Sequence, residues 1–275
     1  MRHPKNALFL IFYHEVRRNK GLAGLLITGA LVAVLAIFLV YSREEIRLVS
    51  RGVDPRHLAR QWAINVSFIE TTIFVLLSPF LGLMSQAAIG RGRSRDLFLL
   101  APRASLFYVM RWFFSLSLVI VLLGISSCLY LYFVKMGFPI AEVAASRMTL
   151  LSMATAFSAL GFCAGILLRE VSVSLVLSYL MVSLLTGQVL LAGPFLDQLA
   201  DPGRMIYLLM VTNGYAGMAS SFDLDIMRRG WLYDVSPVGM YRFDYPAWYA
   251  VAIFHAAMAA VFIMAGLRGH KRVLT

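Results

Sequence analysis

The chain has 275 residues, of which 60% are hydrophobic and only 14% are charged, and its formal net charge is +11. A soluble domain carries about a quarter charged residues, so this composition excludes an ordinary soluble domain and indicates a membrane protein. The positive charge would also suit nucleic-acid binding, but most Lys and Arg residues lie in short segments beside apolar runs, where they act as orientation signals. We therefore expect no nucleic-acid partner.

The amino-terminal segment 5–20 is predicted to be an amphipathic helix that lies in the membrane interface. Leu8, Phe12 and Val16 share one helical face, and basic residues cluster at the end that leads into the first apolar run. Apolar residues on one face with basic residues beside them are typical of interfacial helices. The alternative is a basic tail that carries a few apolar residues.

Six apolar windows are long enough to cross a bilayer, which needs roughly 20 residues. They run over about 22–42, 63–89, 112–134, 148–168, 171–191 and 248–267. The predicted fold class is therefore an all-α membrane protein with six transmembrane helices, forming a single domain over 1–275. An even number of spans places both termini on one side, and the basic residues of 1–20 and 90–111 place that side in the cytoplasm. We expect a multi-pass protein of a cell membrane, specifically the bacterial inner membrane.

The outer segments in this topology are 43–62, 135–147 and 193–247. The last of these is the longest stretch outside the spans, and it contains an apolar piece from Met205 to Ala219. That piece has 15 residues, too few to cross the hydrocarbon core comfortably. A re-entrant or interfacial helix is therefore predicted there, on the extracytoplasmic side before the last span.

The cytoplasmic segment 91–111 combines five arginines with the apolar, helix-like run "DLFLLA". A short helix at this point would offer Leu97, Phe98 and Leu100 to a groove on a partner, the usual way in which a short helix docks. The alternative is that the segment serves only as a positive-inside signal for orientation.

At this segment the chain resembles the permease subunits of type 2 ABC exporters, whose loop after the second span often reads as a basic stretch, G-T-L-E, leucines and T-P-x-S. The matching positions here are Ser94, Asp96, the run 97–100, Pro102 and Ser105. The order of parts is similar over nearly the whole length. Departures from the pattern are Arg93, Arg95 and Ala101, where that family usually has Gly, Leu and Thr.

The resemblance implies that 91–111 is a coupling region seated on a separate ATPase subunit, with contacts from Ser94, Asp96, Leu97, Phe98, Leu100 and Pro102. It also implies a second permease chain, identical or related, as a partner. The sequence contains no G-x-x-x-x-G-K-[ST] motif, so ATP and Mg²⁺ would bind to the ATPase subunit and this chain would have no cofactor of its own. No catalytic or metal-binding motif is present either.

The predicted function is thus that of a transport subunit that couples ATP hydrolysis to export of a lipidic or amphipathic substrate, with membrane lipid around it. One alternative within this class is a mechanotransmission module that acts on an extracytoplasmic partner. From other classes, the chain could be an intramembrane enzyme or a membrane anchor of a larger complex.

Two ionisable residues within the predicted spans are functional candidates, because such groups are costly in a bilayer. Glu70 follows Trp62 by eight residues and His255 follows Trp248 by seven, so the two lie at similar depths if each tryptophan marks an interface. They could face each other. The alternative is that Glu70 is protonated or bonded to nearby threonines and that His255 is an ordinary packing residue.

Overall fold

The computed structural model describes residues 4–86, 104–168, 170–196, 198–226 and 237–274, and in these parts the chain is helical and contains no strand. The helices in chain order are α1 (Pro4–Arg18), α2 (Lys20–Val49), α3 (Pro55–Met84), α5 (Ala104–Lys135), α6 (Ile140–Leu168), α7 (Val171–Leu191), α8 (Gly193–Leu196), α9 (Pro202–Val211), α10 (Gly214–Ser220), the 3-10 helix η1 (Pro237–Met240) and α12 (Trp248–Leu274).

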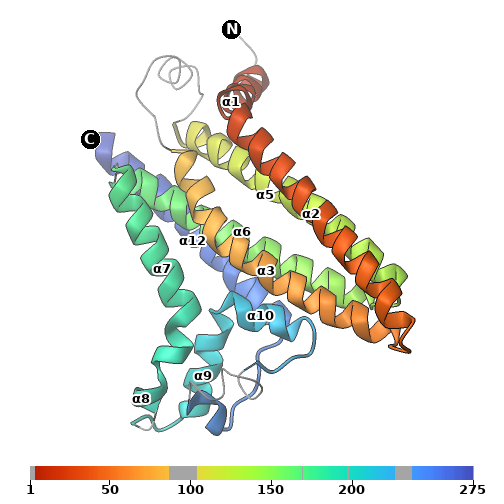
Figure 1. Ribbon diagram of the computed structural model, residues 1–275. Helices are drawn as coiled ribbons and strands as arrows, with labels where there is room; N and C mark the ends of the chain where they lie inside the picture. Colours follow the sequence, from red (N-terminus) through yellow and green to blue (C-terminus); the bar gives the residue numbers. More distant parts are fainter. Residues whose placement is uncertain (1–3, 87–103, 169, 197, 227–236, 275) are drawn as a thin grey trace.

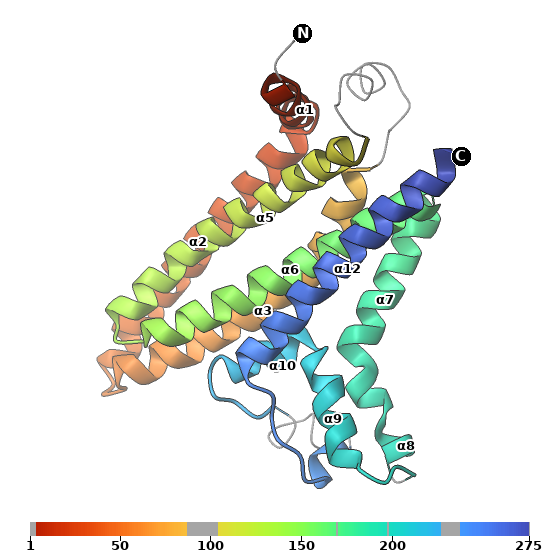
Figure 2. The ribbon, with the colours of Figure 1, turned by 180° about the vertical axis from the view of Figure 1, so that it is seen from behind.

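Six of these helices, α2, α3, α5, α6, α7 and α12, are long and apolar enough to cross a membrane. The predictions of an all-α fold and of six spans are therefore confirmed, and the chain is a multi-pass membrane protein. Both termini lie at one end of the bundle, which we call the termini end (Figure 1). Helices α8 and α9 lie at the opposite end, which we call the α9 end, and the view from behind shows the same arrangement (Figure 2).

The helices are longer than the hydropathy windows and include most of the residues of the predicted outer segments 43–62 and 135–147. The link between α2 and α3 is only 50–54, and the link between α5 and α6 is only 136–139. Each contains a glycine with positive φ, +83° at Gly52 and +99° at Gly137, a conformation that glycine adopts without steric cost. The charged residues on either side of these turns continue the helices, because no helix breaker separates them from the apolar runs.

Helix α6 is the centre of the bundle, with α3 and α12 packed along it and α5 and α7 at its sides. Two glycines allow the closest approach, between α3 and α6. A Cβ atom on Gly82 would lie 1.9 Å from the carbonyl oxygen of Ser158, and one on Gly161 would lie 2.0 Å from that of Pro79. The backbones of α3 and α6 therefore touch at this crossing, which fixes the relative position of the two helices.

Helix α1 occupies most of the predicted interfacial segment 5–20 and packs on α5. The face that packs on the bundle is not the apolar face predicted to contact the membrane. Ile11 and Glu15 are buried, whereas Val16 is exposed and Phe12 is only partly covered. The helix packs through the face that contains an acidic residue, because that residue has a buried cationic partner on α5, described below.

The apolar piece 205–219 does not form one helix. It is divided between α9 and α10 at Asn213, whose side chain caps α10 and also donates a 2.7 Å hydrogen bond to the carbonyl oxygen of Thr186 at the end of α7. Helix α10 is buried among α3, α6 and α12. The predicted single re-entrant or interfacial helix is therefore replaced by two short helices, and neither α9 nor α10 is long enough to cross a bilayer.

Candidate functional site

The predicted coupling residues Ser94, Asp96, Leu97, Phe98, Leu100 and Pro102 lie outside the described residues. The carboxyl-terminal part of the predicted region 91–111 is described, and there the chain belongs to a long apolar helix. Helix α5 begins at Ala104, and Arg111 is fully buried against α1. The six predicted contact residues all precede Ala104 in the sequence.

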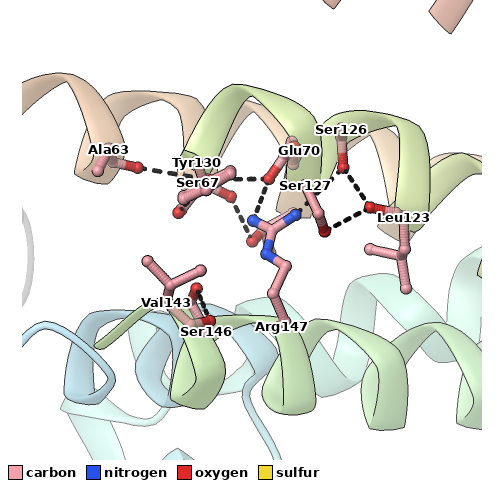
Figure 3. Close-up of polar contacts among 11 residues, drawn as sticks. Ala63, Ser67, Glu70, Leu123, Ser126, Ser127, Tyr130, Val143, Ser146 and Arg147 are labelled. Atoms are coloured by element: carbon pink, nitrogen blue, oxygen red, sulfur yellow. Dashed lines mark hydrogen bonds and ion pairs between the residues drawn. The ribbon is translucent and has the colours of Figure 1, made fainter. Parts of the chain in front are cut away.

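Glu70 lies in the middle of α3 and is 7% exposed, so its carboxylate is one of the buried polar groups of the bundle. Its Oε2 atom forms an ion pair with Arg147 of α6. The same atom accepts a 3.0 Å hydrogen bond from the hydroxyl of Tyr130 in α5. Figure 3 shows these side chains converging from three helices on one carboxylate oxygen.

Further hydrogen bonds extend this cluster. The hydroxyls of Ser67 and Tyr130 are 2.5 Å apart. Because the single Tyr130 proton is directed at Glu70, Ser67 acts as the donor in this contact. Arg147 donates a 3.1 Å bond to Ser126, and its guanidinium carbon lies 4.0 Å from the centre of the Tyr130 ring, a cation–π contact. We call Ser67, Glu70, Ser126, Tyr130 and Arg147 the polar cluster.

The polar cluster is a neutral unit, because one carboxylate and one guanidinium balance each other inside the bundle. Burying two charges costs several kcal/mol each, and a close, well-bonded partner offsets that cost. The two oxygens of Glu70 differ in their surroundings. Oε2 accepts both described bonds, while Oε1 accepts none within the described residues and is not fully enclosed. One acceptor oxygen therefore remains for another donor.

A partly open cavity of about 320 Å³ lies beside Glu70, between α2, α3 and α5. We call it the α2–α3–α5 crevice. Sixteen residues line it, and among them only Glu70 and Ser126 have polar side chains. Three of the α2 residues that line it, Gly29, Ala30 and Ala33, have small side chains that leave the cavity space open. The polar cluster thus forms part of the wall of an otherwise apolar crevice at membrane depth.

His255 does not join this cluster. Its Nδ1 atom lies 2.9 Å from the carbonyl oxygen of Val251 one turn earlier in α12, and its Nε2 atom forms no hydrogen bond within the described residues. The ring is fully buried and makes edge contacts with Phe157 and Phe254. The possible pairing of Glu70 with His255 is therefore not observed, because Arg147 occupies the position of the ionic partner.

A second buried ion pair joins α1 to α5. The Nε atom of Arg111 lies 2.8 Å from Oε1 of Glu15, and both side chains are almost completely enclosed. Arg18 and Asn19 also donate to the Glu15 carboxylate. The apolar residues around the pair include Ile11, Phe107 and Trp112. This pair holds the amino-terminal helix on the bundle.

Both arginine partners were missed because hydropathy windows end at a charged residue. Arg147 was assigned to an outer segment and Arg111 to an inner one. The sequence did carry a usable signal: no Gly or Pro separates Arg147 from Ile140, so the helix can begin before the charge, and an acidic residue in a span requires a donor. Because Arg111 and Arg147 lie within helices of the bundle, the inner and the outer segments each contain one basic residue fewer than assumed. The difference in basic residues between the two sides, on which the predicted orientation rests, is therefore unchanged.

Among the described residues, no group of three or more His, Cys, Asp or Glu side chains is arranged to hold a metal ion. Comparison with family models, with curated proteins and with solved structures finds no match to this chain. The class that the fold defines is therefore a helical, multi-pass membrane protein with a buried ion pair beside an apolar crevice.

Proposed function

We propose that the chain is the membrane subunit of an ATP-driven transporter similar to the type 2 ABC exporters. A separate ATPase subunit would hydrolyse ATP with Mg²⁺ and dock on the segment before Ala104. A second permease chain, identical or related, would complete the assembly. The cargo is a lipidic or amphipathic molecule, and the protein resides in a cell membrane, of the bacterial inner-membrane kind, with both termini in the cytoplasm.

The order of elements along the chain is the observation that carries this proposal. An amino-terminal helix packed beside the bundle precedes six long apolar helices, and short helices α8 to α10 lie between the fifth and sixth of these. Those short helices lie at the end opposite to the termini (Figures 1 and 2). This is the order of parts that the resemblance at 91–111 implies. The apolar crevice supports a lipidic or amphipathic cargo.

An intramembrane enzyme is less well supported. Such an enzyme would need Glu70 and His255 to act on one substrate, but Glu70 is engaged by Arg147 and Tyr130. His255 bonds only to its own helix within the described residues. A mechanotransmission module would use the same ATPase docking, and it differs from an exporter in needing no cargo site in the membrane.

Docking of the ATPase is tested by co-purification with variants of the segment before Ala104. Apolar anchors carry most of the energy of such an interface, and exposed ion pairs contribute about 1 kcal/mol or less each. We expect Phe98→Ala and Leu97→Asp to abolish recovery of the ATPase while the subunit still inserts. Arg93→Ala, the matched control, should retain it. Normal recovery with both apolar variants would contradict the proposed coupling role.

The topology is tested by labelling single cysteines with a membrane-impermeant reagent in intact cells, after replacing Cys128 with Ser and Cys163 with Ala. Gln198 and Glu170 are exposed in links at opposite ends of the bundle. We expect modification with Gln198→Cys and protection with Glu170→Cys until the cells are opened. The reverse pattern would contradict a cytoplasmic position of the termini.

A further inference from the structure

We propose that the α2–α3–α5 crevice binds a neutral, single-chain amphiphile whose hydroxyl group donates a hydrogen bond to Oε1 of Glu70. The inference deepens the proposed function, because it assigns a site and a ligand chemistry to the lipidic cargo. Its test needs the membrane subunit alone, so it can fail or succeed independently of ATPase docking.

The shape of the crevice suits one hydrocarbon chain. On α2 its wall extends from Leu25 to Ile37, a length of about 18 Å at the helical rise of 1.5 Å per residue. Small residues along this wall leave the space open, and a Cβ atom added at Gly29 would meet no atom within 4 Å. The opposite wall is formed by apolar residues of α3, from Val66 to Leu77, and a few residues of α5.

The polar group lies toward one end of this wall. Glu70 is four residues from Val66 and seven from Leu77, so a chain anchored at Glu70 would extend toward the termini end of the bundle. In a bilayer the molecules available to fill an apolar crevice at this depth are amphiphiles with hydrocarbon tails. A tail alone would leave Oε1 of Glu70 without a donor, and a buried acceptor without a donor is unfavourable.

The charge balance selects the kind of donor. Arg147 already neutralises Glu70, so an ammonium group in the crevice would introduce an unbalanced positive charge into a region of low dielectric constant. A hydroxyl supplies the hydrogen bond without the charge. An alcohol head group is therefore favoured over both an amine and an ether.

Photolabelling of the purified full chain in lipid nanodiscs tests this inference. The probe is a long-chain primary alcohol with a diazirine in its chain, and labelled peptides are identified by mass spectrometry. We expect labels on the stretches of α2 and α3 that line the crevice. Unlabelled alcohol should compete roughly tenfold better than its methyl ether or the matching alkylammonium, because hydrogen bonds to charged acceptors are among the stronger ones.

Two variants separate the tail site from the head-group site. Gly29→Leu should fill the crevice and reduce labelling to background. Gly24→Leu is the matched control, because Gly24 is also unobstructed on α2 but does not line the crevice. The pair Glu70→Met with Arg147→Met removes both charges, so labelling should persist while the preference for alcohol over ether disappears.

Several outcomes would overturn the inference. Equal competition by alcohol and ether would show a tail site without head-group recognition, and stronger competition by the ammonium compound would show that the site attracts a cation. Labelling that Gly29→Leu leaves unchanged would place the ligand elsewhere. Normal ATPase recovery with both Phe98→Ala and Leu97→Asp in the docking experiment, with labelling intact, would count against the proposed function and leave this site standing.

Discussion

The two buried ion pairs of this protein have the same chemistry and different surroundings. Glu15 and Arg111 join α1 to α5 near the termini end and are enclosed by apolar side chains. Glu70 and Arg147 join α3 to α6 and border an apolar crevice. In the first pair, several donors converge on the acid. In the second, one carboxylate oxygen remains open to a ligand.

This difference shows how a structural ion pair can be distinguished from one that is available for binding. Burial and an opposite charge are common to both pairs, so neither property decides. What distinguishes the two pairs is the open space beside Glu70 and the one oxygen of its carboxylate that can still accept a hydrogen bond. Changes to either pair should therefore lower stability, whereas only changes at Glu70 and Arg147 should alter what the crevice binds.

The largest effect is expected from removing one charge of the pair in the middle of the bundle. Glu70→Leu leaves the Arg147 guanidinium buried at membrane depth, and loss of one partner of a buried pair costs about 3–5 kcal/mol. The thermal midpoint in detergent should fall sharply, or the protein should fail to insert. The double variant Glu70→Met with Arg147→Met should recover most of the loss. A single variant as stable as the native protein would contradict the buried pair.

The crossing that positions this pair is the next most sensitive point. Gly161→Ala would place a Cβ atom about 2.0 Å from the Pro79 carbonyl oxygen, so α3 and α6 must move apart. Overpacking of this kind costs about 1–3 kcal/mol or more. Gly187→Ala is the control, since Gly187 meets no atom within 4 Å. We expect a lower thermal midpoint and weaker photolabelling of the crevice only with Gly161→Ala. Equal behaviour of the two variants would argue against the close approach.

The features that the sequence predicted are those that depend on long apolar runs. The six spans follow from length and hydropathy and are present in the structure, whereas the division of 205–219 into two short helices was not predicted. The partners of the charged residues were not predicted, because pairing depends on which helices become neighbours. Glu70 was identified as a candidate from its position alone, but Arg147 is 77 residues away in sequence and lies on a different helix.

The peripheral pair should give a smaller effect than the central one. In Glu15→Leu, helix α1 can move away and leave Arg111 accessible to the membrane surface, so the charge need not remain buried. We expect a loss of about 1–3 kcal/mol, the cost of a buried group left without its partner. Limited proteolysis should cut near Asn19 faster, because α1 is then held less firmly. Crevice labelling should be unchanged, and a loss of labelling would contradict the separation of the two pairs.

The smallest effect is expected at His255, the second ionisable residue singled out from the sequence. Its ring is as fully buried as Arg111, but its only hydrogen bond within the described residues goes to the Val251 carbonyl oxygen on the same helix. One such bond contributes about 1 kcal/mol net, so His255→Leu, which keeps the site apolar, should cost about that amount or less. Thermal unfolding beside Glu70→Leu measures the contrast directly. Loss of crevice labelling with His255→Leu would contradict this prediction and would indicate that His255 and Glu70 act together.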